Sequence, residues 1–250
     1  MYSSPVRRHN FAFSFLPVDT CRQRISELSV TVSGCPGFRE TTDSFDNGKI
    51  YGCVELPHDI FEIQLCGRAE TGLDIFEEYT QDSPGCAVFR AQTALTAPGD
   101  AIWAYYESLS LHGSDYEKAT RLMRSLHETL RYLPGATAAH EPAETAFAQG
   151  QGVCQDYAHI MLSLLRMEGI PARYVTGMTL GEGASHAWVE ALCNGYWYGF
   201  DPTNNLLVDD GYIRAACGRD SADCAIIRGT FYGLAQQVQR EQVLVQEETA

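Results

Sequence analysis

The amino-acid sequence predicts an α+β protein with an N-terminal antiparallel β domain over residues 1–85 and a second domain over residues 86–250, in which a helix packs on an antiparallel sheet. Three observations predict this organisation. Apolar and polar residues alternate with period two up to about residue 80, apolar residues recur at helical spacing from Ala97, and a helix after residue 150 is followed by a hairpin. We expect the domain boundary within residues 75–100.

Three segments of the first domain have the alternation that is typical of half-buried strands. The apolar residues that share one face are Phe11, Phe13 and Phe15 in FAFSF, Leu28, Val30 and Val32 in LSVTV, and Phe61, Ile63 and Leu65 in FEIQL. The tripeptide Asp46-Asn47-Gly48 predicts a hairpin turn, because Asn-Gly tolerates the positive φ angles of a tight turn.

The sequence after Ala97 predicts two helices before the central motif. Pro98 and Asp100 favour a helix start, and Ser114 with Glu117 forms a capping-box pattern at the start of a second helix. The apolar residues of that second helix are Leu122, Met123, Leu126 and Leu130. His127 also falls in it, and we expect a packed or solvent-facing histidine there rather than a ligand.

Composition restricts the partners and the cellular location. The chain has 18 basic and 32 acidic residues, a net charge of −14, which argues against nucleic acid and anionic membranes as partners. No apolar run has the length of a membrane helix, and the N-terminus lacks the apolar segment of a signal peptide. The nine cysteines form no Cys-x-x-Cys pair. Free thiols and a cytoplasmic location are therefore expected.

The segment GQGVCQDYAH, residues 150–159, places Cys154 behind Gly150 and Gly152 at the start of a helix. That helix is expected to bury Ile160, Met161, Leu164 and Leu165 and to end at Gly169, before Pro171. Burial alone is the ordinary explanation for one cysteine. At a helix N-terminus, however, the free amides and the helix dipole favour the thiolate and also an oxyanion formed on a substrate carbonyl.

The hairpin downstream supplies an acid and a base. If Asn194-Gly195 is a two-residue loop, His186 lies opposite Thr203. Asp201 then projects from the same face as His186, diagonally across the ladder at a backbone distance of about 7–8 Å. A one-residue slip would put the two side chains on opposite faces. The sequence therefore predicts a catalytic Cys154, His186 and Asp201.

Four polar residues near the cysteine have less specific signals. Gln149 or Gln151 is a candidate side-chain donor for the oxyanion hole. Asp156, in the first turn of the helix, is expected to be a structural anchor. His159 is not on the helical face of Cys154, so we expect it to pack in the interior.

Three separated motifs, in the same order, resemble the transglutaminase-like superfamily, in particular its bacterial branch of papain-related cysteine enzymes. They are GQGVCQDYAHIMLSLLRMEGIPARYVTGM, SHAWVEAL and GYWYGFDPTNN, and the resemblance covers residues from about 125 to 206. The first domain is similar to the β domain of bacterial members in its placement, while its residues match weakly.

The resemblance implies a papain-like core and a Cys-His-Asp triad at Cys154, His186 and Asp201. Trp188 and Tyr157 are expected to shape the pocket, as is the segment Pro202-Thr203-Asn204. Family members form a thioester from an amide carbonyl and pass the acyl group to water or to an amine. We expect a peptide or protein amide as the substrate, hydrolysis as the outcome, and no cofactor or metal.

Three alternatives remain open at this stage. The acyl group could pass to an amine instead of water. The fold could serve as a catalytically silent interaction scaffold, although an intact triad weighs against that. The same three side chains could bind zinc, as ligands of those types do.

The C-terminal part of the chain has weaker patterns. Cys193 flanks the predicted turn and is expected to be exposed, whereas Cys217 and Cys224 are expected in a loop-like tail. Tyr212, Phe231 and Tyr232 suggest that the segment packs on the core. The sequence after residue 234 fits either a strand or a fraying tail.

Overall fold

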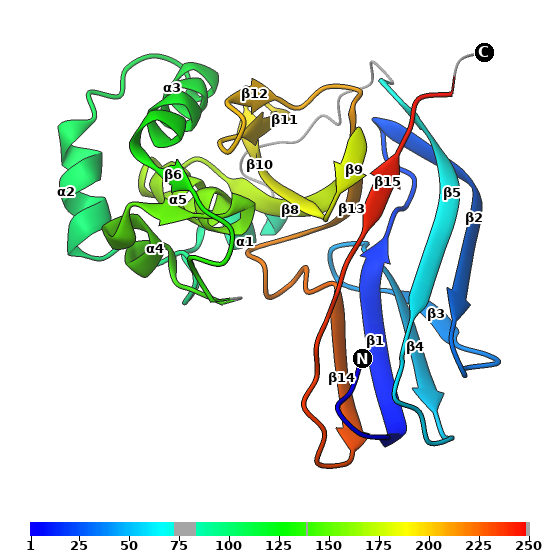
Figure 1. Ribbon diagram of the computed structural model, residues 1–250. Helices are drawn as coiled ribbons and strands as arrows, with labels where there is room; N and C mark the ends of the chain where they lie inside the picture. Colours follow the sequence, from blue (N-terminus) through cyan, green and yellow to red (C-terminus); the bar gives the residue numbers. More distant parts are fainter. Residues whose placement is uncertain (73–83, 139, 249–250) are drawn as a thin grey trace.

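A computed structural model describes residues 1–72, 84–138 and 140–248 of the chain. Figure 1 shows helices on one side, a β structure built largely from the N-terminal strands on the other, and an antiparallel sheet between them. The predicted α+β fold, a helix packed on an antiparallel sheet beside an N-terminal β structure, is confirmed.

The N-terminal β structure consists of a four-stranded sheet, in the order β14-β1-β4-β3, and the two-stranded pair β2-β5. Its strands are β1 (Arg7–Leu16), β2 (Gln23–Val32), β3 (Arg39–Thr42), β4 (Gly48–Val54), β5 (Ile63–Thr71) and β14 (Ile227–Tyr232). The three phenylalanines of β1 form a buried core, against which apolar residues of β2 and β5 pack. The predicted alternation in FAFSF and FEIQL is confirmed.

The predicted face of LSVTV is wrong for its first residue. Leu28 is exposed, whereas Val30 and Val32 pack on the core. The register of β2 against β5 shifts between Ser26 and Ser29, and Glu27 adopts a φ of 52°. This irregularity interrupts the alternation, so Leu28 turns away from the face that the later residues share.

The predicted hairpin at residues 46–48 is present, but its geometry differs from the prediction. Gly48 already belongs to β4, and the positive φ of 60° falls on Asp46. The Asp43 carboxylate accepts hydrogen bonds from the backbone amides of Phe45 and Asn47, at 2.8 and 3.1 Å. A side-chain acceptor thus closes a longer loop in place of the two-residue Asn-Gly turn.

The central sheet has the order β12-β11-β10-β8-β13 and is antiparallel throughout. Its strands are β8 (Ala172–Thr179), β10 (His186–Cys193), β11 (Tyr196–Asp201), β12 (Leu206–Leu207) and β13 (Tyr212–Gly218). Beside it, β9 (Gly181–Gly183) pairs with β15 (Val243–Val245), so the undecided C-terminal segment contains a strand.

The helices are α1 (Pro84–Arg90), α2 (Asp100–Ser108), α3 (Asp115–Thr129), α4 (Ala143–Gln149) and α5 (Cys154–Met167), with the short parallel pair β6 (Arg131–Tyr132) and β7 (Gln151–Gly152). The capping box of Ser114 and Glu117 is formed as predicted. Glu144 of α4 accepts hydrogen bonds from the first amides of α2 at Gly99, Ala101 and Ile102, which fixes α4 just ahead of Cys154.

Helix α5 lies at the centre of the larger core, between the other helices and the sheet. Every residue from Asp156 to Arg166 is buried, so the predicted apolar stripe was too narrow. The buried Arg166 guanidinium donates to the Phe89 and Ala172 carbonyls and to the Thr96 hydroxyl. Since a buried charge requires such partners, this arginine ties the end of α5 to the sheet.

The C-terminal segment contributes a strand to the N-terminal β structure. Strand β14 pairs with β1 in the N-terminal sheet, although residue 227 lies far beyond the predicted boundary at 85/86. The physical reason is that the outer edge of β1 needs a hydrogen-bonding partner. The boundary itself stays a prediction, and residues 75–83 of its expected range lie outside the described residues.

Two further predictions about the cysteines are wrong. Cys193 is buried rather than exposed, and Cys217 belongs to strand β13 rather than to a loop. All nine cysteines are free thiols in the structure. Within the described ranges, no helix is both long enough and apolar enough to span a membrane.

Two side-chain amides bind the outer edge of β13 to the N-terminal β structure. Gln23 exchanges hydrogen bonds with the backbone of Arg214, and the buried Asn47 does so with the backbone of Cys217 at 2.7 Å in both directions. Each amide thereby replaces a neighbouring strand. The edge of the central sheet is closed by residues nearly 200 positions away.

Replacing Asn47 by Ala should lower the free energy of unfolding by about 2–3 kcal/mol, because the buried backbone groups of Cys217 lose both partners. Denaturant unfolding monitored by circular dichroism measures this. Asn10→Ala, at an exposed position of β1, is the matched control and should change stability by less than about 0.5 kcal/mol. Equal losses in both variants would contradict the role of the Asn47 bridge.

Candidate active site

Cys154 is the first residue of α5 and is half-buried. Gly150 ends α4 with a φ of 66°, in the left-handed region that favours glycine. At Gly152 a Cβ would lie 2.6 Å from Asp156 Oδ2, so this position has no room for a side chain. The two glycines allow the chain to leave α4 and enter α5 within a few residues.

Asp156 anchors the start of α5. Its Oδ2 accepts hydrogen bonds from the Val153 amide at 2.7 Å and from the Thr137 hydroxyl at 2.6 Å. Burial raises the pKa of this carboxyl, and those two hydrogen bonds oppose the shift. The geometry agrees with the expected structural role.

The hairpin of β10 and β11 has the predicted register. Asn194 and Gly195 adopt φ angles of 52° and 87°, and Cys193 pairs with Tyr196. His186, at the start of β10, and Asp201, at the end of β11, therefore project from the same face of the sheet at the open end of the hairpin. His186 Nε2 lies 2.7 Å from Asp201 Oδ2.

The same histidine also contacts Cys154. Its Nε2 is bonded to Asp201, and a side-chain hydrogen bond joins the imidazole to Cys154. Because Nε2 is already occupied, Nδ1 is the ring nitrogen that faces the sulfur. The structure thus brings together the three residues that the sequence singled out. The Asp201 side chain is fully buried, and that of His186 is 13% exposed.

The electrostatics of the pair favour the charged forms of both residues. Burial lowers the pKa of His186, but hydrogen bonds and charge from Asp201 and Cys154 outweigh burial and raise it to about 10. Burial raises the pKa of Asp201, yet His186, Asn204 and Tyr212 hold it below its usual value. An imidazolium beside a carboxylate is therefore the favoured state near neutral pH.

Sequence reasoning missed several residues of the site. The Asn204 side chain and the Tyr212 hydroxyl donate to Asp201 Oδ2, at 2.7 and 2.9 Å, and the amide of Thr203 donates to Oδ1 at 3.0 Å. The DPTN motif indicated Thr203 and Asn204 only as flanking residues. Tyr212 gave no local signal of this contact, because it reaches the site from β13.

Tyr132 is a second unexpected neighbour. It pairs with Gly152 in the β6-β7 ladder, and its side chain is 51% exposed. Partial desolvation and the charge of Cys154 raise the pKa of its hydroxyl. An exposed phenol beside the cysteine is a surface that a substrate can contact.

The remaining predicted residues have varied positions. Gln149 is exposed at the end of α4, and Gln151 is half-buried on β7. Trp188 is buried, with its ring 6.4 Å from that of His186. Tyr157 is buried and donates to the Leu130 carbonyl at 2.8 Å. Their roles as oxyanion donors or pocket residues stay predictions.

Neither of the other two histidines singled out belongs to the site. His159 is buried and accepts a hydrogen bond from the Ser221 amide, and burial lowers its pKa to about 4, in accord with packing in the interior. His127 is exposed and bonds the Thr203 carbonyl at 2.9 Å. In the part of the chain that the structure describes, no three His, Cys, Asp or Glu residues are arranged to hold a metal ion.

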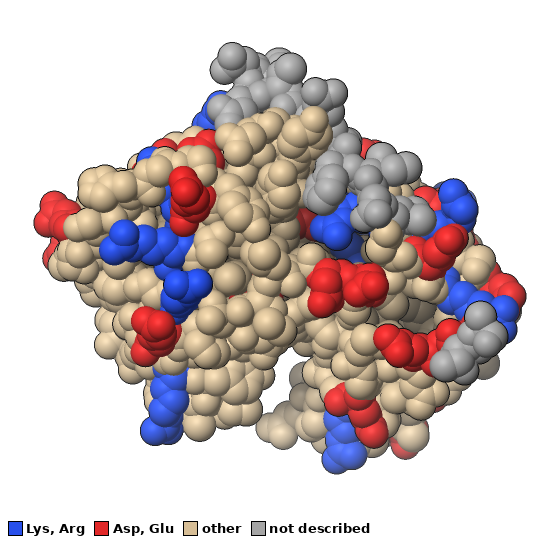
Figure 2. Space-filling model, turned by 90° about the horizontal axis from the view of Figure 1, so that it is seen from above, with Lys and Arg blue, Asp and Glu red and all other residues tan. Residues whose placement is uncertain are grey.

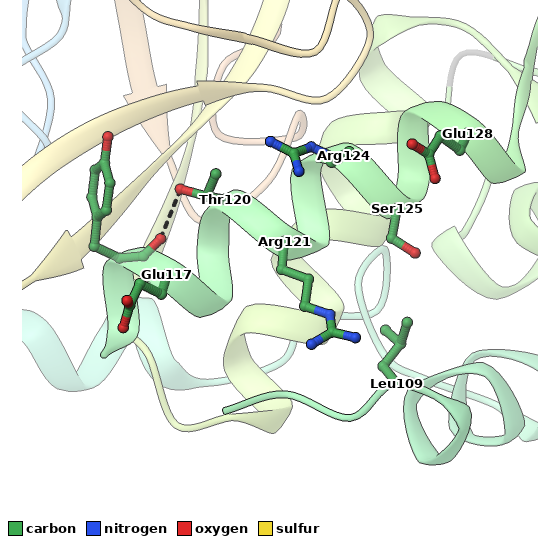
Figure 3. Close-up of a pocket in the computed structure, with 8 residues that line it drawn as sticks. Leu109, Glu117, Thr120, Arg121, Arg124, Ser125 and Glu128 are labelled. Carbon is green, nitrogen blue, oxygen red and sulfur yellow. Dashed lines mark hydrogen bonds between the residues drawn. The ribbon is translucent and has the colours of Figure 1, made fainter. Parts of the chain in front are cut away.

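The surface hollow of Figure 3 lies along the outer face of α3 and has a volume of about 580 Å³. Its lining includes Arg121, Arg124 and Glu128 but none of the triad residues. On the face shown in Figure 2, acidic and basic side chains are interspersed. The convergence of Cys154, His186 and Asp201, rather than a charged patch, therefore defines the candidate site.

Comparisons with known proteins bear on the family and the fold of the chain. The model of the transglutaminase-like superfamily matches residues 105–202, and that of the bacterial transglutaminase-like N-terminal region matches residues 1–70. A crystal structure of a candidate cysteine protease from Cytophaga hutchinsonii has a TM-score of 0.78 and 21% identity, covering 99% of this chain and 90% of that one. At 21% identity, this likeness shows that the two proteins share a fold.

Two mycobacterial relatives, both uncharacterized, are also similar. A Mycobacterium leprae protein is 35% identical over 151 residues, which cover 56% of this chain and 54% of that protein. A Mycobacterium tuberculosis protein is 28% identical over 266 residues, covering 92% of this chain and 84% of that protein. This chain thus matches about half the length of the first relative and most of the second.

Replacing Asp201 by Asn should lower the pKa of His186 from about 10 toward 6.5 or below, because burial then acts without the opposing carboxylate. Nuclear magnetic resonance titration of the imidazole measures this. In the wild type the raised pKa contributes stability that is complete below pH 6.5 and is lost as the pH rises through 10. A His186 pKa unchanged by the substitution would contradict this account.

Proposed function

Because the chain belongs to the transglutaminase-like superfamily, we propose that it is a cysteine hydrolase, a protease or amidase that cleaves amide or peptide bonds through Cys154, His186 and Asp201. The observation that carries this proposal is the His186–Asp201 contact of 2.7 Å beside a cysteine at the first turn of α5. Nucleophile, base and orienting acid are thereby in one continuous chain of hydrogen bonds.

The first half-reaction forms a thioester. Nδ1 of His186 accepts the Cys154 proton, the sulfur attacks the amide carbonyl, and the C–N bond breaks while the same Nδ1 returns the proton to the leaving amine. Asp201 holds Nε2–H, so that Nδ1 is the nitrogen that exchanges the proton. Its negative charge also stabilises the imidazolium that His186 becomes when it holds the Cys154 proton.

The negative charge on the carbonyl oxygen develops near the N-terminus of α5. Cys154 is the first residue of α5, a position whose amide has no intrahelical acceptor, so the Cys154 amide can donate to an oxyanion. Gln151, half-buried two residues before Val153, is the better placed of the two predicted side-chain donors, since Gln149 is exposed at the end of α4.

In the second half-reaction, we infer that water releases the acyl group. His186 removes a proton from water as the oxygen of that water attacks the thioester carbonyl. The C–S bond then breaks, the acid product leaves, and His186 returns the proton to the Cys154 sulfur. The substrate is then a peptide or protein amide. The net charge of −14 disfavours nucleic acid and anionic membranes as partners, and nine free thiols support a cytoplasmic location.

Iodoacetamide should label the Cys154 peptide of the wild type near pH 6, and replacing Cys154 by Ala should abolish both this labelling and amide hydrolysis, because the variant has no sulfur to act as nucleophile. Mass spectrometry of the digested protein measures labelling at each cysteine. Cys66→Ala, at an exposed thiol, is the matched control and should retain both properties.

Two results would contradict this assignment. Hydrolysis that persists in Cys154→Ala would move the nucleophile elsewhere. A wild-type protein that binds peptides but whose Cys154 resists iodoacetamide would indicate a silent scaffold. Metal analysis of the same protein tests the zinc alternative, for which stoichiometric zinc is required.

With a glutamine-containing peptide and an excess of a primary amine such as dansylcadaverine, the wild type should release ammonia and the free acid without coupling the amine. The physical reason is that water is present in large excess over any added amine and competes with it for the thioester. Ammonia release and fluorescence of the recovered peptide measure the two outcomes. Predominant coupling would identify the chain as an acyltransferase.

A further inference from the structure

One oxygen of Asp201 is shared by three side-chain donors. His186 Nε2, Asn204 Nδ2 and the Tyr212 hydroxyl approach Oδ2 at 2.7, 2.7 and 2.9 Å. The other oxygen, Oδ1, accepts the backbone amides of Thr203 and Asn204. Since a carboxylate offers about four acceptor positions, this one is saturated, and its donors compete for the same electron density.

Tyr212 is the donor that comes from outside the hairpin. It is the first residue of β13 and lies opposite Thr179, the last residue of β8. Tyr212 is therefore at the same end of the strands as His186 and Asp201. His186 and Arg214 both pair with Gly177, one on each side of β8. The tyrosine therefore reaches the triad from the far side of a strand.

Strand β8, which lies between the strands of His186 and Tyr212, has no space for a side chain at Gly177. A Cβ at Gly177 would lie 2.1 Å from the Ile213 carbonyl oxygen and 2.6 Å from Cη2 of Trp188. The buried indole of Trp188 packs edge-on against the Tyr212 ring, with centroids 5.3 Å apart and planes at 79°. The Tyr212 ring is thus held in one orientation, with its hydroxyl directed at Asp201.

We propose that Tyr212 is a positioning residue of the hydrolase, whose hydroxyl both orients Asp201 and withdraws charge from the oxygen that binds His186. A weaker pull from Oδ2 leaves Nδ1 of His186 acidic enough to return its proton to the leaving amine. The inference rests on the proposed function of the triad. It adds a residue that sets the strength of the Asp201–His186 hydrogen bond.

The pKa of His186, raised to about 10, supports this role. An imidazolium with a pKa near that value is already a weak acid, and a stronger pull from Asp201 would raise the pKa further and slow proton return. The neutral hydroxyl of Tyr212 opposes that, because it lowers the charge density of the carboxylate without adding a positive charge.

The charged and titratable groups around the dyad come from several elements. Cys154 faces His186 from α5, and Asp209, between β12 and β13, adds to the elevated pKa of Tyr212. Glu190 and Arg214 also line the hollow that contains Tyr212, and they lie within 3.6 Å of each other as an ion pair. None of these groups is altered by a change from Tyr to Phe.

Tyr212→Phe should raise the pKa of His186 above its wild-type value and lower kcat for peptide-amide hydrolysis by about tenfold, the factor that one hydrogen bond to a charged group supplies. KM should change little. Nuclear magnetic resonance titration of His186 measures the pKa, and kinetics measures kcat and KM. Tyr212→Phe should thus raise the His186 pKa, whereas Asp201→Asn should lower it. A general loosening of the site would not produce the rise.

Tyr106→Phe is the matched control. It removes another tyrosine–carboxylate hydrogen bond, to Glu168 at the far end of α5, and should leave the His186 pKa and kcat unchanged. Melting temperatures of both variants report folding. Iodoacetamide labelling of wild-type Cys154 distinguishes a failure of the proposed hydrolase function from a failure of the inference about Tyr212. If Cys154 is not labelled, the proposed function itself is overturned. If Cys154 is labelled but Tyr212→Phe leaves the His186 pKa unchanged, the inference about Tyr212 is overturned and the triad stands.

Discussion

The register of β10 against β11 is the constraint on which the site depends. Side chains alternate between the two faces of a strand, so a slip of one residue would separate His186 from Asp201 completely. The two positive φ angles at Asn194 and Gly195 are those of a two-residue loop, which pairs Cys193 with Tyr196. A turn at the far end of the hairpin thereby fixes the contact of 2.7 Å at its near end.

Burying Asp201 completely is acceptable only because the carboxylate is surrounded by donors. An unpaired buried charge would cost several kcal/mol, and here three side chains and two backbone amides satisfy it. The same saturation limits how strongly Asp201 binds any one donor. The donors that share Oδ2 therefore have two effects. They compensate the buried charge of Asp201, and they limit the strength of its hydrogen bond to His186, so that His186 can still release a proton.

Much of this arrangement follows from local sequence patterns, and the rest does not. The Ser114 cap, the Asn194-Gly195 turn and the alternation in β1 depend on neighbouring residues, so the sequence alone predicts them. Contacts such as Asn47 with Cys217 or Tyr212 with Asp201 depend on which strands become neighbours. The exposure of Leu28 depends on a β-bulge. The predicted exposure of Cys193 is wrong because its position beside a turn carries no information about the core residues that pack against it.

Strand β13 links these contacts into one mechanical unit. Its outer edge is bound by Gln23 and Asn47 of the N-terminal β structure, and its first residue, Tyr212, is bonded to Asp201. An edge strand without those amides would have exposed or unsatisfied backbone groups along its length. Strand β13 therefore joins the N-terminal β structure to the candidate site: one strand carries both the backbone groups bonded to Asn47 and the Tyr212 hydroxyl bonded to Asp201.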